Sequence, residues 1–223
     1  MQRAAADGVE VRMTERQSAK TGRLRFIAAL VALTAIWLAM LFGGNGLVDA
    51  VIYRALYVGN EPTLVPIARF FTALGEPTVL IIASVVIAIL LWVAGHRQLP
   101  FAFVAITMAG RGLSQAQKYW IGRARPDLET HLVLVKTSSF PSGHANSSMI
   151  FYLTLVLILA SGTRWRGVAV AGALALSLMV GLSRVMLGVH WPSDVVGGWA
   201  FGMLWVLVTL RLGQRWVQDD VIR

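Results

Sequence analysis

Two histidines and a carboxylate are the side chains in this sequence whose types and spacing best suit catalysis. His190 and Asp194 stand four residues apart in the stretch SRVMLGVHWPSD. Pro192 suits the first turn of a helix, which puts Asp194 in that turn and within reach of His190. A carboxylate on one imidazole nitrogen leaves the other nitrogen free as a base or nucleophile. A structural cap beside a hydrogen-bonded interfacial histidine would have the same spacing, so this stretch alone does not decide the chemistry.

The second histidine, His144, lies in the stretch FPSGHANSS. Pro-Ser-Gly before an apolar run predicts a helix start, with Ser142 as its cap. The free N–H groups of a helix N-terminus favour phosphate, and Gly143 lets an anion approach the backbone closely. Ordinary helix capping, with His144 at the water interface, is the alternative.

Three cations accompany these histidines. Lys118 and Arg125 belong to the stretch KYWIGRARPD, and Arg184 precedes His190. Pro126 predicts that the chain leaves the helix near Arg125, so Lys118 and Arg125 can point at one place. Alone, such a cluster is also typical of basic side chains that reach towards lipid headgroups. Positive charge converging on a helix N-terminus beside two histidines indicates an oxyanion site of the kind that phosphoryl transfer needs.

A polar stripe leads up to Lys118. Arg111, Ser114, Gln115 and Lys118 fall at helical spacing, so they should face the interior of a helix bundle. Arg111 is therefore a candidate for supporting the site from behind, or a paired structural charge. The position of Arg123 in the sequence does not indicate a role for it. We group it with Arg111 as a second residue that could support the site residues without binding the phosphate.

The composition places these residues in a membrane protein. The chain has 223 residues, of which 57% are hydrophobic and 14% charged, against ~45–50% and ~25% in soluble domains. Its net charge of +9 fits charge bias in membrane loops and needs no nucleic-acid partner. The absence of cysteine excludes disulfides and thiolate chemistry.

The predicted fold is all-α, with six transmembrane helices in one domain over residues 24–212. The six apolar runs cover residues 24–42, 78–94, 99–117, 147–160, 167–182 and 195–212. Residues 43–76 predict short amphipathic helices on the outer interface, between the first and second spans. Small residues between 167 and 175 favour close helix packing.

The basic residues predict the orientation. Twelve of the 20 fall in residues 1–25, which include the polar leader 1–23, in two short loops and in the tail from Arg211, all on one side of a six-span layout. The positive-inside rule therefore favours a cytoplasmic N-terminus and C-terminus. We expect a bacterial cytoplasmic (inner) membrane, with the three polar stretches meeting at its outer, periplasmic face.

Together the three stretches resemble the signature motifs of the type 2 phosphatidic acid phosphatase family. The matching patterns are Lys118-x6-Arg125-Pro126, Pro141-Ser142-Gly143-His144 and Ser183-Arg184-x5-His190-x3-Asp194. Three motifs in the right order form a specific signal, although each alone is weak. The six-span layout is similar to the membrane branch of that family.

The resemblance implies a role for each residue. His190 would form a phosphohistidine, Asp194 would orient it, and His144 would be the general acid and then the base that activates water. The phosphate would be held by Lys118, Arg125, Ser142, Gly143 and Arg184. The family implies no metal and no cofactor, and we infer no obligate protein partner.

The substrate and the acceptor stay open. A phosphate site at a membrane boundary suits a lipid phosphate such as phosphatidic acid, phosphatidylglycerol phosphate, lipid A or undecaprenyl diphosphate. A phosphotransferase that passes the group to another lipid or sugar would carry the same motifs. More distant alternatives are a transporter, a metal hydrolase using His144, His190 and Asp194, and an intramembrane serine protease using Ser142 or Ser183.

Overall fold

The fold is all-α throughout the described chain. The structure, a computed structural model, describes residues 2–213, with side chains from residue 17 onward except residue 19, and every regular element there is a helix. This confirms the predicted fold class for those residues. The helices are α1 Gln2–Gly43, α2 Leu47–Leu56, α3 Leu64–Leu74, α4 Pro77–Val93, α5 Leu99–Ile121, α6 Gly143–Leu159, α7 Arg166–Met186 and α8 Pro192–Leu212.

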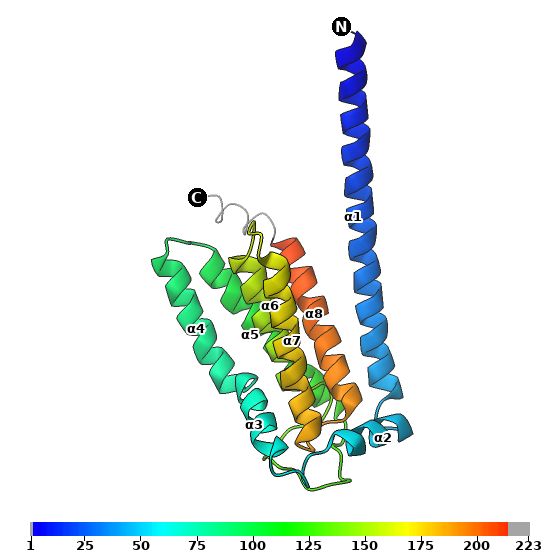
Figure 1. Cartoon of the computed structure of the whole chain (residues 1–223), viewed down its shortest axis with the longest axis vertical. Helices are drawn as coiled ribbons and strands as arrows, with labels where there is room; N and C mark the ends of the chain where they lie inside the picture. The colour runs from blue at the N-terminus through cyan, green and yellow to red at the C-terminus, as the bar shows by residue number, and fades with distance from the viewer. Residues whose placement is uncertain (1, 214–223) are drawn as a thin grey trace.

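Five long helices, α4 to α8, form a bundle in which successive helices alternate in direction (Figure 1). α6 is central, because it packs against α4, α5, α7 and α8. α1 packs along α8, and its N-terminal part extends beyond the bundle (Figure 1). The short helices α2 and α3 lie at one end, where the C-termini of α5 and α7 meet the N-termini of α6 and α8 (Figure 1).

Three of the described helices are long and apolar enough to cross a membrane. They are Lys20–Gly43, Arg166–Met186 and Pro192–Leu212, and α3 with α4 counts as a fourth if the 43° bend between them lies within one span. α5 carries the polar stripe, and α6 has 17 residues. The six-span prediction is therefore met by helices in the expected places, but it is not confirmed as a set of membrane spans.

Several boundaries differ from the predicted ones. α5 continues to Ile121, one turn past the expected end, and it stops at Gly122, whose φ of 63° is left-handed. The chain thus leaves the helix before Pro126. The predicted short helices within residues 43–76 are present as α2 and α3. The polar leader continues α1 as helix, whereas the predicted tail 213–223 lies, apart from Gly213, outside the described residues.

Ala173 of α7 is buried, as close helix packing predicts, but the two glycines at the start of α7 do not lie close to a neighbouring helix. A Cβ added to Gly167 or Gly172 would meet no atom within 4 Å. A Cβ added to Gly198 would lie 2.8 Å from the carbonyl oxygen of Ser142. The expectation for residues 167–175 was therefore wrong at both of these glycines, because that face of α7 does not contact a neighbouring helix. Gly198 instead lets α8 approach the N-terminus of α6.

Candidate active site

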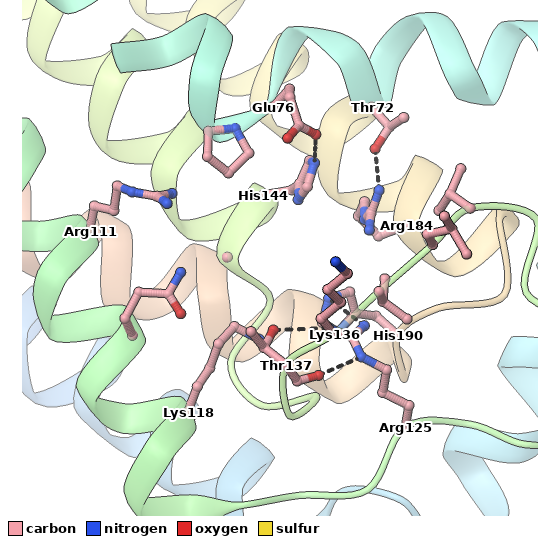
Figure 2. Close-up of a pocket in the computed structure, with 16 residues that line it drawn as sticks. Thr72, Glu76, Arg111, Lys118, Arg125, Lys136, Thr137, His144, Arg184 and His190 are labelled. Carbon is pink, nitrogen blue, oxygen red and sulfur yellow. Dashed lines mark hydrogen bonds and ion pairs between the residues drawn. The ribbon is translucent and has the colours of Figure 1, made fainter.

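Seven of the ten predicted site residues line a cavity of about 280 Å³ at the end of the bundle near α3 (Figure 2). The cavity has walls from α3, α5, α6 and α7 and from the loop between α5 and α6. Asp194, Arg123 and Ser142 do not line it. The predicted residues that do line it are Arg111, Lys118, Arg125, Gly143, His144, Arg184 and His190.

His190 and Asp194 form the expected pair. Nδ1 of His190 lies 3.2 Å from Oδ2 of Asp194, and both side chains are buried. His190 follows the turn at Gly188, whose φ is 80°, and Asp194 lies in the first turn of α8. Because Nδ1 is engaged by the carboxylate, Nε2 is the nitrogen left for the cavity. Its neighbour there is the Arg125 guanidinium, with Nη1 at 3.3 Å.

The Asp194 carboxylate is held from several directions. The backbone N–H of Trp191 donates to Oδ2 over 2.9 Å, and the hydroxyl of Ser139 donates to the same oxygen. The Ser139 oxygen also lies 3.3 Å from Nδ1 of His190. A fully buried carboxylate loses its hydration, and these donors replace it. Ser139 therefore contacts both members of the pair.

Arg123 completes the shell around Asp194. Its Nη1 lies 2.9 Å from Oδ1 of that carboxylate. Its Nη2 donates to the carbonyls of Met40 and Leu41, at 2.8 Å and 2.6 Å, near the end of α1. The guanidinium also lies 4.3 Å from the ring centroid of Phe140. Arg123 thus contacts Asp194 from the side away from the cavity, which is the supporting position that we considered for it from the sequence. It also links α1 to the carboxylate beside His190.

The three predicted cations approach the cavity from different elements. Lys118 donates from Nζ to the carbonyls of Ser138 and Ser139, at 2.7 Å and 3.1 Å. Arg125 donates from Nε to the carbonyl of Thr137 over 2.8 Å. These carbonyls belong to the loop that leads into α6, so the cations also order that loop.

Arg184 enters from α7. Its Nη1 donates to the hydroxyl of Thr72 on α3 over 2.6 Å, and its Nε is buried without a partner among the described residues. Figure 2 shows its guanidinium facing the cavity from the side opposite Lys118. A buried guanidinium with unused donors is suited to bind an anion.

His144 pairs with a carboxylate that the sequence did not single out. Its Nε2 lies 3.1 Å from Oε2 of Glu76, which stands in the break between α3 and α4 (Figure 2). The Glu76 side chain is half exposed. Burial disfavours the protonated form of His144, and the carboxylate of Glu76 opposes that effect.

Ser142 and Gly143 open α6, as predicted, but Ser142 does not cap it through its side chain. Ser142 occupies the N-cap position without a side-chain capping bond, and its hydroxyl is buried with no partner in the described chain. The expectation of a side-chain cap was therefore wrong, since that hydroxyl does not meet the first N–H groups of the helix. Gly143 lines the cavity, where its backbone is open to an anion.

The environment of His190 favours the neutral imidazole. Burial lowers the pKa of His190 well below its ordinary value, and the nearby charges of Lys118, Arg125 and Arg184 lower it further. Desolvation and like charge both disfavour the protonated form. His190 therefore presents a lone pair, rather than a proton, in the empty site.

Thr72, Glu76 and Ser139 are the site residues that sequence reasoning missed. No motif marks them, since Thr72 lies in α3, Glu76 was noted only between Gly75 and Pro77, and Ser139 precedes the second polar stretch. The amphipathic pattern of residues 64–74 was the one available signal, because it predicted a helix beside the site. The contact of Thr72 with Arg184 depends on how α3 packs against α7. Those of Glu76 and Ser139 depend on the elements that bring His144 and Asp194 beside them.

Two of the alternative chemistries do not match the geometry. Among the residues that the structure describes, no group of three or more histidine, cysteine or acidic side chains is arranged to hold a metal ion. The Ser183 hydroxyl donates to the carbonyl of Val180, and the Ser142 hydroxyl has no partner in the same part of the chain. Neither serine is therefore paired with a histidine, as a serine protease would need.

Comparison with known proteins agrees with this site. A model of the PAP2 superfamily matches residues 99–218, which include all three motifs. Phosphatidylglycerophosphatase B of Bacillus subtilis (strain 168) is 30% identical over 162 residues, which are 70% of this chain and 78% of that protein. The undecaprenyl-diphosphatase of Sulfolobus acidocaldarius is 31% identical over 122 residues, covering 52% of this chain and 56% of that protein.

The fold is also that of solved membrane phosphatases. A transmembrane PAP2-type phosphatidylglycerolphosphate phosphatase from Bacillus subtilis superposes with a TM-score of 0.76 at 26% identity, over 83% of this chain and 96% of that chain. LpxE of Aquifex aeolicus has a TM-score of 0.60 at 18% identity, over 75% of this chain and 98% of that one. The fold and the site thus define an integral membrane hydrolase of phosphate esters. The chain belongs to the PAP2 superfamily, within its membrane lipid phosphatases.

Proposed function

We propose that this chain removes a phosphate group from a lipid phosphate monoester or diphosphate through a phosphohistidine on His190. One observation supports this most directly. Nδ1 of His190 is engaged by Asp194, while its Nε2 lies beside Arg125 at the cavity that Lys118 and Arg184 also line. A buried, neutral imidazole with one free nitrogen among cations is suited to attack phosphorus.

In the first half of the reaction, the Nε2 lone pair forms a bond to phosphorus and the bond from phosphorus to the leaving oxygen breaks. His144 donates its proton to that oxygen, so the lipid leaves as a neutral alcohol or a protonated phosphate. Asp194 stabilises the charge that His190 gains. Lys118, Arg125 and Arg184, with the Gly143 N–H, bind the three equatorial oxygens.

In the second half, His144 takes a proton from a water molecule whose oxygen attacks phosphorus. The bond between phosphorus and Nε2 breaks, inorganic phosphate forms, and His190 returns to its neutral state. Glu76 supports both halves, since its carboxylate stabilises protonated His144. Three fixed cations supply the charge that the transition state needs, so the proposed reaction uses no metal.

The relatives support a lipid substrate. Their names specify phosphatidylglycerol phosphate, lipid A and undecaprenyl diphosphate. Each carries a phosphate at the polar end of an apolar lipid, and a membrane hydrolase with its site at one end of the bundle can reach such a group while the tail stays in the bilayer.

The function is tested by trapping the intermediate. A ³²P-labelled lipid phosphate mixed with purified protein in detergent and chelator should label the protein in an acid-labile, base-stable form typical of phosphohistidine. With a diphosphate lipid, whose leaving phosphate needs little protonation, His144→Ala should accumulate the label because water is no longer activated, and His190→Ala should abolish it. Label on a residue other than His190, or wild-type turnover by His190→Ala, would overturn the mechanism. Transfer of the label to an added lipid or sugar instead of water would identify the phosphotransferase.

The proposed topology has six spans, both termini in the cytoplasm and the site at the outer face of the cytoplasmic membrane. The alternating directions of α4 to α8 support it (Figure 1). Because the chain has no cysteine, a single introduced cysteine is its one thiol. Labelling of that thiol shows on which side of the membrane the residue lies. Glu129→Cys should react with an impermeant maleimide added outside intact cells, and Thr163→Cys should react only after lysis. The reverse pattern would refute the orientation.

A further inference from the structure

The cavity holds more positive charge than one phosphate needs. Besides Lys118, Arg125 and Arg184, it is lined by Arg111 and Lys136, and its one carboxylate is Glu76. Lys136 lies on an exposed loop. Arg111 is different, because it belongs to α5 and its guanidinium is directed into the cavity, towards His144 (Figure 2).

Arg111 is unpaired within a helix of the bundle. No hydrogen bond or ion pair from the residues that the structure describes reaches its guanidinium. Charged side chains in membrane helices are costly, and they occur where they face a polar cavity or bind a partner. The Asp194 carboxylate is occupied by Arg123, and Glu76 is bonded to His144. Arg111 therefore has its donors free for a ligand.

The position of Arg111 indicates which part of a ligand it would meet. It precedes Lys118 by seven residues on the same face of α5, which is two turns or about 10 Å along the helix. Lys118 is in the last turn of α5, at the open end of the bundle. Arg111 therefore lies further along α5 from that end of the bundle than Lys118, although its side chain is less buried.

A narrow crevice, largely apolar, continues beyond Arg111. It runs between α4, α5 and α6, and Arg111 lines both it and the cavity. Its apolar walls include Leu80, Ile81, Met108 and Phe151. The order along this path is the phosphate site, then Arg111, then apolar surface. The crevice itself, at about 10 Å³, is too small to enclose a lipid chain. A lipid whose tail lies against this apolar surface and whose terminal phosphate is at His190 has the group next to that phosphate beside Arg111.

We infer that Arg111 is a second anion-binding residue, which binds a phosphate group lying between the scissile phosphate and the lipid tail. This inference rests on the proposed function, and it narrows the substrate to lipids with two phosphates. The second group is the inner phosphate of a prenyl diphosphate or the phosphodiester of phosphatidylglycerol phosphate. Phosphatidic acid has no such group, because its one phosphate is joined directly to diacylglycerol.

The test compares kcat/KM of the wild type and Arg111→Gln on a prenyl diphosphate, phosphatidylglycerol phosphate and phosphatidic acid in one detergent. Arg111→Gln should lose about tenfold or more on a two-phosphate lipid, the usual scale for a hydrogen bond to a charged group. It should stay within about threefold on phosphatidic acid, since nothing there contacts Arg111. Arg111→Lys should recover part of the loss. The two-phosphate lipid that shows the larger loss identifies the source of the second anion.

Arg54→Gln is the matched control, because Arg54 is an exposed arginine of α2 outside the cavity, and it should match the wild type on all three lipids. An equal loss by Arg111→Gln on all three would mean that Arg111 is structural, and no loss on any would mean that it binds nothing. Either result overturns the inference, as does a wild type that accepts only phosphatidic acid.

A binding measurement separates this inference from the proposed function. Inorganic pyrophosphate should raise the melting temperature of the wild type in detergent more than inorganic phosphate does, and Arg111→Gln should remove that difference. This readout needs no turnover. Suppose that the wild type released no phosphate from any lipid but still bound pyrophosphate in preference to phosphate, and that this preference depended on Arg111. The proposed hydrolase function would then be refuted, and the anion-binding role of Arg111 would be supported. Equal shifts with both anions in the wild type would refute the anion site.

Discussion

Nη1 of Arg123 lies 2.9 Å from Oδ1 of Asp194, and both side chains are buried. The same guanidinium donates to two carbonyls near the end of α1. Arg123 therefore does more than neutralise Asp194. It fixes the carboxylate against α1, and through that carboxylate it orients the imidazole of His190. The role of Arg123 is positioning, since it does not line the cavity.

Replacing Arg123 should damage both stability and turnover. Arg123→Met leaves a buried carboxylate without its cation, and breaking a buried ion pair costs about 3–5 kcal/mol. Arg123→Lys keeps the charge but loses the planar guanidinium, whose two Nη atoms bind Asp194 and the end of α1 at the same time. We expect Met to lower the melting temperature and kcat strongly, and Lys to recover kcat in part with KM little changed. A loss confined to KM would contradict a positioning role, and Arg54→Met, at an exposed arginine of α2, serves as the control.

Ser139→Ala should lower kcat by about tenfold or more, because hydrogen bonds to charged groups contribute ~1.5–3 kcal/mol. The lost hydroxyl donates to Asp194 and lies beside Nδ1 of His190. KM should change little, since Ser139 does not line the cavity. Ser138→Ala is the matched control, because in the described structure the Ser138 hydroxyl donates only to the backbone carbonyl of Lys118. Steady-state kinetics that show equal effects for the two serines would refute the special role of Ser139.

Glu76→Gln should weaken His144 as a proton donor. The substitution keeps the shape beside Nε2 of His144 but removes the charge that stabilises its protonated form. An alcohol leaving group needs that proton more than a nitrophenolate does. We therefore expect a larger loss of kcat on a lipid phosphate monoester than on p-nitrophenyl phosphate. Equal losses on both substrates would argue that Glu76 only supports packing.

The depressed pKa of His190 predicts a stability change with pH. In the unfolded chain His190 takes up a proton near pH ~6.5, whereas burial and neighbouring cations keep it neutral in the folded protein. Below about pH 6.5 the unfolded state then binds more protons, so acidification lowers the free energy of unfolding by up to ~1.4 kcal/mol per pH unit. The loss continues until the pH reaches the lower folded pKa.

His190→Asn removes this titration and is the reference for measuring it. The melting temperature of the wild type, minus that of His190→Asn, should fall as the pH drops from 7.5 to 5 in detergent. A difference that stays constant or grows on acidification would show that His190 is not held neutral.

Gly198→Ala should destabilise the contact between α8 and α6. The added Cβ would lie 2.8 Å from the Ser142 carbonyl oxygen and 3.1 Å from Cβ of Ala145. Overpacking of this kind costs about 1–3 kcal/mol, and here it also displaces the start of α6 that carries His144. We expect a lower melting temperature and lower activity. Gly172→Ala, where a Cβ meets nothing within 4 Å, should leave both unchanged or raise stability slightly.

Much of the helix pattern was readable in the sequence, because it depends on residues that are neighbours along the chain. Apolar runs and proline positions predicted α4, α7 and α8 to within a few residues. Where a boundary was missed, a backbone feature decided it, as with the left-handed Gly122 that ends α5. Gly167 and Gly172 of α7 misled because composition does not say which face of a helix meets another, whereas Ala173 of the same helix is buried.

The sequence by itself determined the residues of the proposed site, since three motifs hold the histidines, the carboxylate and the cations in short, fixed spacings. Only the tertiary structure decided what surrounds them. Glu76 and His144 are 68 residues apart, and Arg123 and Met40 are 83 apart. Contacts over such separations depend on helix packing, which no local pattern encodes. For the same reason, only the folded bundle turned Arg111 from one member of a polar stripe into a free cation between a phosphate site and an apolar crevice.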